Sequence, residues 1–266
     1  MKMPLLGAAF FYLYFPRFFV KNSAEISNMA NFELLNNKTH QHLRVGAGFP
    51  EGVGCHGTIM VLPCEIQEVQ REYPIIFRRH SQSGHFFPCA LLGFEQKENL
   101  YVDEAGQWQS VYKPLSAAKG PFLIGLDRNE DLEKQAPLVY VDIDDPRVGQ
   151  TEGERVFDDA GEPTPYMASV SNALRVLHEM AREIPRMVEA FTALRLIEPV
   201  NIKLDFSNGE KVSFSGAYTI NIDKLQSLKS DELFSLNKEG FLSNAFYIAG
   251  SLNNISKLLT IKNNKH

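Results

Sequence analysis

Two carboxylates at the end of an apolar run are the first residues whose types and spacing could support catalysis or metal binding. Asp142 and Asp144 follow the stretch Leu138 to Val141 and are one residue apart. Alternate residues of a strand point to the same face, so these two side chains are expected side by side. Such a pair holds a divalent cation, or one member has a raised pKa for acid–base chemistry. The alternative is a strand end that enters an exposed turn, with both aspartates solvated.

A second candidate metal set surrounds a predicted hairpin turn. His80 and His85 flank the turn Ser81–Gly84 and could face each other across it. Cys89 shares the parity of His85, and with Cys55 and His56, or with Cys64, these residues could form a His/Cys metal set. No Cys-x-x-Cys or His-x-x-x-His spacing supports the set, and the alternative is two exposed histidines beside reduced cysteines. Both pairs, Asp142 with Asp144 and His80 with His85, are therefore speculative metal ligands.

Motifs for covalent or nucleotide chemistry are nearly absent. Ser116 to Lys119 matches S-x-x-K, but the companion motifs of that enzyme class are missing. The chain has no G-x-S-x-G, no P-loop and no G-x-G-x-x-G. We therefore predict no catalytic residue and no cofactor.

Antiparallel strands are expected to position these residues in the N-terminal half. Apolar runs at 75–77 and 85–94 flank the turn 81–84, which indicates a hairpin. Runs at 100–102 and 107–112 flank a second turn and predict a second hairpin. Further strand candidates lie at 58–62, 121–125 and 138–143.

Helices and one late hairpin are expected in the C-terminal half. Thr164 and Pro165 have the residue types of a helix N-cap and first turn, and a second helix is expected from Pro185. Asn208 and Gly209 separate two alternating runs, which is a strong hairpin signal. An apolar stripe from Phe241 to Leu259 predicts one terminal helix. The fold class is therefore α+β: a mostly antiparallel β portion, then helices and a late β-hairpin.

Composition excludes several classes of protein. The 266 residues contain 27 Lys and Arg against 32 Asp and Glu, a net charge of −5. A mildly acidic chain lacks the basic footprint of a general nucleic-acid binder. The chain has only three cysteines, an odd number, so it is not a scaffold held together by disulfides.

The first 28 residues differ from the rest. An apolar, aromatic run from Pro4 to Phe15 is too short to span a bilayer. It is read as an upstream extension before a start at Met29, as a signal or membrane anchor, or as a structured element. A start at Met29 predicts a cytoplasmic protein, and the alternative is the cell envelope, reached through residues 1–21. The expected organisation is thus an extension (1–28), one domain (29–260) and a frayed tail (261–266).

Several stretches, in order along residues 29–260, resemble the SapC family of bacterial proteins. The resembling pieces are Met29 to Val45, Glu72 to Phe77, Ala90 to Phe94, Glu98 to Val102, Gly106 to Trp108 with Tyr112, Pro121–Phe122, Val156 to Pro163, Gly209–Glu210 and Gly216 to Ile220.

The resemblance implies association with bacterial surface layers and provides no catalytic residues. It leaves room for a ligand pocket built around Asn99, Trp108 and Tyr112. Our first hypothesis is a non-catalytic binding or assembly protein of the surface layer that contacts protein or glycan. The second is a cytoplasmic module that binds a small molecule or peptide for an envelope pathway. The third is a metal-assisted enzyme that uses Asp142, Asp144, His80 or His85.

Overall fold

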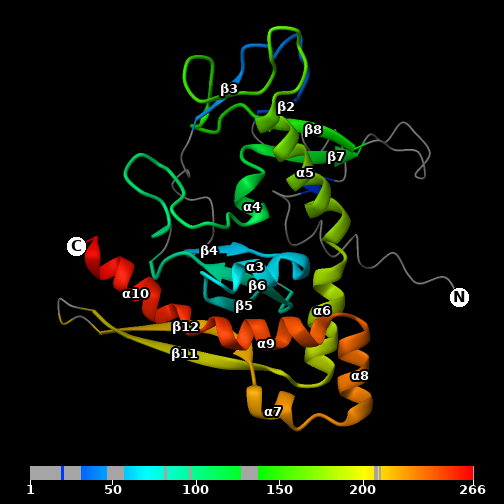
Figure 1. Ribbon diagram of the computed structural model, residues 1–266, viewed down its shortest axis with the longest axis vertical. Coiled ribbons are helices and arrows are strands. Elements are labelled where there is room, and N and C mark those ends of the chain that lie inside the picture. Colours follow the sequence, from blue (N-terminus) through cyan, green and yellow to red (C-terminus); the bar gives the residue numbers. More distant parts are fainter. Residues whose placement is uncertain are drawn as a thin grey trace, which may run out of the picture. The chain divides into compact units, whose positions relative to one another are not determined.

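The computed structural model describes residues 19–20, 31–46, 57–80, 83–95, 98–126, 137–206, 209 and 211–265 (Figure 1). The chain forms two compact units, and it passes between them more than once. The first unit comprises Met1–Pro50, Glu104–Gln107 and Leu115–Arg182. The second comprises Glu51–Asp103, Trp108–Pro114 and Glu183–His266. The predicted extension, residues 1–28, lies outside the described residues apart from Phe19–Val20.

The described residues of the first unit form two small sheets. One has the order β1-β7-β8-β2, and the other has the order β10-β3-β9. Their strands are β1 (Phe19–Val20), β2 (Phe32–Leu34), β3 (Arg44–Val45), β7 (Phe122–Leu126), β8 (Pro137–Asp142), β9 (Val148–Gly149) and β10 (Glu154–Arg155). The predicted strands at 121–125 and 138–143 are confirmed as the antiparallel pair β7 and β8.

Among the described residues of the first unit, the helices are α4 (Leu115–Ala118) and α5 (Pro165–Met180). The predicted N-cap is confirmed, since the Thr164 hydroxyl accepts the Met167 amide at 3.3 Å. Helix α5 contributes Met167, Val170 and Leu174 to a core that also contains residues of β7 and β8. The helical spacing of these apolar residues therefore corresponds to the buried face of α5.

The second unit is built on a five-stranded sheet of order β11-β12-β5-β6-β4. The strands are β4 (Thr58–Met60), β5 (Ile75–Arg79), β6 (Phe86–Leu91), β11 (Ile197–Asp205) and β12 (Lys211–Ile220). Both strong hairpin predictions are confirmed, because β5 pairs with β6 and β11 pairs with β12, each antiparallel. The second predicted hairpin is wrong in extent: the runs at 100–102 and 107–112 meet in a single bridge between Val102 and Trp108.

Short and medium helices complete the second unit. They are η2 (Pro63–Glu65), α3 (Ile66–Val69), α6 (Glu183–Ala193), α7 (Ile222–Gln226), α8 (Ser230–Lys238), α9 (Phe241–Ser251) and α10 (Asn254–Asn264). Helix α9 contacts β5 and β12 (Figure 1). Helix α6 begins at Glu183, two residues before the predicted start.

The single terminal helix predicted from Phe241 to Leu259 is wrong, because the structure breaks it into α9 and α10. At the break, the Asn254 side-chain amide donates to the backbone carbonyls of Gln70 (2.7 Å) and Tyr73 (3.2 Å). This tertiary anchor holds the start of α10 against the loop after α3. Hydrophobic periodicity continues across the break and gives no sign of it.

Candidate functional site

The segment Trp108–Pro114, here called the strap, carries two of the three predicted ligand-binding residues. Its side chains alternate in exposure: Trp108, Ser110 and Tyr112 are half-buried, whereas Gln109, Val111 and Lys113 are exposed. Alternation is typical of extended backbone with one covered face. The strap therefore has an inner face of half-buried side chains and an outer face of exposed ones.

Tyr73 is the centre of the inner face, and its side chain is fully buried. Its hydroxyl donates to the Tyr112 carbonyl at 2.6 Å and accepts the Trp108 indole N–H at 2.8 Å. The Ser110 hydroxyl also bonds to Tyr73 Oη, and it accepts from Trp108 Nε1 at 2.5 Å. One buried phenol thus binds three strap residues, which satisfies the buried polar atoms that the strap brings with it.

Two glutamates complete the attachment. The Glu72 carboxylate accepts the backbone amides of Val111 (3.2 Å) and Tyr112 (2.9 Å), one on each oxygen. The Tyr112 hydroxyl donates to Glu65 Oε2 at 2.9 Å. Hydrogen bonds to ionised carboxylates are among the stronger ones in proteins. The conformation of the strap is therefore determined by side chains of the loop and helix that precede β5.

The phenols of this network are protonated at neutral pH. Burial raises the pKa of Tyr73 to about 12, although the hydrogen bonds from Ser110 and Trp108 oppose that shift. Burial, together with the nearby Tyr73, raises the pKa of Tyr101 further still. Burial and the Glu65 carboxylate do the same for Tyr112. A general base needs a pKa near the working pH, so these tyrosines act as hydrogen-bond donors and not as bases.

Asn99, the third predicted ligand-binding residue, is connected to the strap through Tyr101. Its Oδ1 accepts the Tyr101 amide at 3.0 Å, and the Tyr101 ring packs on Tyr73 with centroids 4.3 Å apart. The Asn99 Nδ2 is buried and has no hydrogen-bond partner among the residues that the structure describes. The structure therefore brings Trp108 and Tyr112 together at Tyr73, and it connects Asn99 to that tyrosine through Tyr101.

The outer face of the strap presents an apolar side chain and a cation. The Val111 side chain is 99% exposed. The Lys113 ammonium lies 5.7 Å from the centroid of the Trp108 ring, within the range of a cation–π contact. A single exposed aliphatic residue is common, but the backbone amide of Val111 is also held by the Glu72 carboxylate.

The predicted carboxylate pair lies in the first unit, at the end of β8. The Asn31 side-chain amide donates to both oxygens of Asp144 at 2.9 Å. Asp142 Oδ1 accepts the Asp144 amide at 3.2 Å. The two carboxylates thus accept hydrogen bonds from a side-chain amide and from a backbone amide of the turn after β8.

The predicted histidine pair lies at the β5–β6 hairpin of the second unit. The backbone amide of His80 donates to the His85 carbonyl at 2.8 Å, and His80 Nδ1 accepts the Ser83 amide at 3.4 Å. Cys89 is buried on β6. Throughout the part of the chain that the structure describes, no three His, Cys, Asp or Glu residues are grouped so as to hold a metal ion. Cys55 and His56 lie outside that part.

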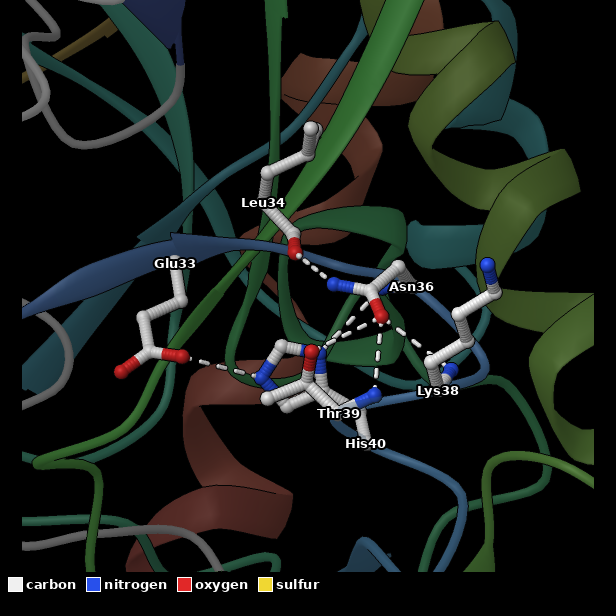
Figure 2. Close-up of polar contacts among 6 residues, drawn as sticks. All are labelled: Glu33, Leu34, Asn36, Lys38, Thr39 and His40. Atoms are coloured by element: carbon white, nitrogen blue, oxygen red, sulfur yellow. Dashed lines mark hydrogen bonds and ion pairs between the residues drawn. The ribbon is translucent and has the colours of Figure 1, made fainter.

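A second polar network in the first unit centres on Asn36 and His40 (Figure 2). Asn36 Oδ1 accepts the amides of Lys38 (3.1 Å) and Thr39 (2.8 Å) and the Thr39 hydroxyl (2.9 Å). His40 Nδ1 accepts the Asn36 amide at 3.2 Å, and its Nε2 lies 3.1 Å from Glu33 Oε2. The side chain of His40 is buried and closes this turn.

Sequence reasoning missed Glu65, Glu72, Tyr73 and Ser110. Tyr73 and Trp108 are 35 positions apart, and Tyr112 and Glu65 are 47 apart. No local pattern joins residues at such separations. The available signal was the family-like string Glu72 to Phe77, which we used as a marker of the fold.

The model of the SapC family matches residues 35–258. No curated protein and no solved structure is detectably similar to the chain. None of the helices in the described ranges is both long enough and apolar enough to cross a membrane. Since the family model covers most of the sequence, the chain belongs to the SapC family.

Proposed function

We propose that this SapC-family protein is a non-catalytic component of a bacterial surface layer that works through contacts with protein or glycan. The observation that carries the proposal is the strap, in which Val111 is 99% exposed while its amide is fixed by Glu72. Holding a segment in place before binding reduces the entropy lost on association. This is the property expected of a contact surface.

The chemistry of the inner face also supports binding over catalysis. Tyr73, Tyr101 and Tyr112 have raised pKa values and remain neutral at physiological pH. Their hydroxyls donate to a carbonyl or a carboxylate within the protein. Donors engaged in this way hold the strap and are not directed at a reacting group.

The test is co-sedimentation of the purified protein with isolated surface-layer sheets. Val111→Glu places a carboxylate at the centre of the outer face and is expected to reduce the bound fraction roughly tenfold. Ile222→Glu is the matched control, because Ile222 is an exposed aliphatic residue of the same unit but lies on α7. Failure of the wild-type protein to sediment with the sheets, or equal losses for the two variants, contradicts the proposal.

A second candidate function is that of a small-molecule or peptide-binding module whose ligand accepts a hydrogen bond from Asn99.

 The observation that favours this function is the Asn99 Nδ2, which is buried without a hydrogen-bond partner in the described residues. A buried donor without a partner is costly, so a ligand oxygen at that position would be stabilising. Asn99→Asp exchanges the donor for an acceptor and leaves the bond from the Tyr101 amide in place. A panel of envelope precursors is screened by thermal shift, and a compound that stabilises the wild type but not Asn99→Asp supports this function.

A further inference from the structure

Helix α9 has an outer face without charged residues. Its buried residues recur at helical spacing and form the inner face: Phe241, Asn244, Ala245, Ile248 and Ser251. The exposed residues of the helix are Ser243, Phe246 and Gly250, which are three and four positions apart and so share the opposite face. The sequence from Phe241 to Ser256 contains no Asp, Glu, Lys, Arg or His. A helix at the surface normally presents charged and polar residues to water, so this face is suited to a partner.

The outer face places a large ring between two small residues. Phe246 is 44% exposed. Gly250 follows one turn later and has open space beside it. Apart from its chain neighbours and the backbone of its own helix, nothing in the described part of the chain lies within 4 Å of the point where a Cβ would stand. Ser243 precedes the ring by one turn, and its short side chain donates to the Gly240 carbonyl at 3.2 Å. The face therefore has a protruding ring and, next to it, room for another ring.

We propose that the outer face of α9 binds a second copy of the chain, with the two α9 helices antiparallel and Phe246 of each copy on Gly250 of the other. A symmetric dimer uses the same surface patch twice, so the patch must complement itself. A ring beside a glycine meets this requirement, because antiparallel packing exchanges the two positions. The proposal uses none of the strap residues and is independent of the surface-layer proposal.

The lack of charge on α9 favours a second copy as the occupant. The whole chain carries a net charge of −5, so two copies repel each other in general. A contact between identical surfaces also brings identical charges together, and like charges across an interface are costly. The uncharged face of α9 avoids both effects.

Charges at the two ends of α9 favour the antiparallel arrangement. Helices α8 and α10 lie at opposite ends of α9 (Figure 1). At the end next to α8, the carboxylates of Glu183 and Glu239 share the guanidinium of Arg186. At the other end, α10 contains no Asp or Glu, and its Lys257 is exposed. Antiparallel packing turns the carboxylates of each copy toward Lys257 of the other, and it also opposes the two helix dipoles.

The test is sedimentation velocity of the purified full chain over a concentration series. The wild type is expected to pass from monomer to dimer as its concentration rises. Phe246→Glu puts a carboxylate into the contact twice per dimer and is expected to raise the dissociation constant by roughly tenfold or more. Phe234→Glu is the matched control, because Phe234 is an exposed phenylalanine on α8. A wild type that stays monomeric, or equal effects of the two substitutions, overturns the proposal.

Gly250→Leu separates the contact from folding. The new side chain starts in open space, so the monomer is expected to keep its stability, as measured by urea denaturation at a concentration below that of dimerisation. The leucine occupies the place of the other copy's ring, so the dissociation constant is expected to rise by roughly tenfold or more. A Gly250→Leu chain that folds and forms dimers as readily as the wild type overturns the proposed packing.

Flotation with phosphatidylcholine vesicles separates a lipid surface from a second copy. An uncharged face with an exposed phenylalanine could also insert into a bilayer interface. Our proposal predicts that vesicles do not bind the wild type through this face. Vesicle binding that Phe246→Glu abolishes and Phe234→Glu does not would assign the outer face of α9 to a membrane and overturn the proposal.

Discussion

The indole N–H of Trp108 donates to the buried hydroxyl of Tyr73 at 2.8 Å, which joins the strap to a residue two positions before β5. Trp108 is the only tryptophan of the chain, so tryptophan fluorescence reports on the surroundings of this one side chain. Because Tyr73 also donates to the Tyr112 carbonyl, one side chain couples the beginning of the strap to its later residues. Loss of that side chain should therefore release the strap as a whole.

Tyr73→Phe removes the shared hydroxyl and leaves Trp108 Nε1 and the Tyr112 carbonyl with fewer partners. We expect the free energy of unfolding to fall by about 1–3 kcal/mol, because buried polar groups lose hydrogen bonds. Urea denaturation followed by circular dichroism measures this loss, and the Trp108 emission maximum of the folded variant should shift. Tyr247→Phe, a change to a half-buried tyrosine on α9, is the control. Equal stability of the two variants would contradict the central position of Tyr73.

The pKa of Tyr73 predicts a loss of stability at alkaline pH. Its ordinary value is 10.0 in the unfolded chain, and burial raises it to about 12 in the folded protein. A raised pKa means that its contribution is complete below pH 10 and is lost as the pH rises from about 10 to about 12. The difference in unfolding free energy between wild type and Tyr73→Phe should therefore change across this window. A constant difference from pH 8 to 12 would contradict the raised pKa.

Lys262 should anchor α10 through two carboxylates. Its ammonium is 2.5 Å from Glu95 Oε1 and 2.5 Å from Glu98 Oε1, and its side chain is 9% exposed. Burial lowers the pKa of Lys262, but the hydrogen bonds and charges of the two glutamates outweigh it and raise the pKa overall. Lys262→Met leaves Glu98 without its cation and is expected to cost about 3–5 kcal/mol of unfolding free energy.

The control for Lys262 is Lys257→Met, on the exposed side of the same helix. Chemical denaturation of both variants at pH 7 gives the comparison. Since a raised lysine pKa stabilises the fold below its unfolded value, the difference between wild type and Lys262→Met should shrink only as the pH rises above about 10.4. A Lys262→Met variant as stable as Lys257→Met would show that the ion pairs contribute nothing.

Asp145 should contribute to stability on the acid side. Burial opposes its ionisation, but the side-chain and backbone hydrogen bonds and the charge of Arg147 outweigh burial and hold the pKa below its ordinary 3.8. The two side chains form a bidentate pair at 2.9 and 2.7 Å. A lowered pKa means that the contribution is present above the unfolded value of 3.8 and is lost as the pH falls through the folded one.

Asp145→Asn is therefore expected to lower the denaturation midpoint at pH 7, and the difference from wild type should narrow below about pH 4. Asp159→Asn is the control, because Asp159 pairs with Arg155 but is 92% exposed. Thermal unfolding between pH 2 and 7 measures both variants. If Asp159→Asn lowers the midpoint as far as Asp145→Asn does, burial of the Asp145–Arg147 pair does not explain the loss of stability.

Local signals predicted the β5–β6 and β11–β12 hairpins and the start of α5. The residues that specify a turn or a helix cap are close together in the sequence. The division into two units was not predicted. The chain enters the first unit for only four residues, Glu104–Gln107, and then returns to the second unit with the strap, so no linker marks the boundary. The break between α9 and α10 depends on Asn254 and carbonyls more than 180 positions earlier. For the site, residue types suggested Trp108 and Tyr112, whereas Tyr73 and Glu72 became visible only through tertiary contacts.

The most direct test of the surface-layer proposal is photo-crosslinking from Val111 in intact cells. A benzophenone amino acid replaces Val111, and the same substitution at Phe234, which is 68% exposed on α8, is the control. Our account predicts a crosslink from position 111 to a surface-layer protein or glycan and none from position 234. Crosslinks to that layer from neither position, or equally from both, would contradict the account.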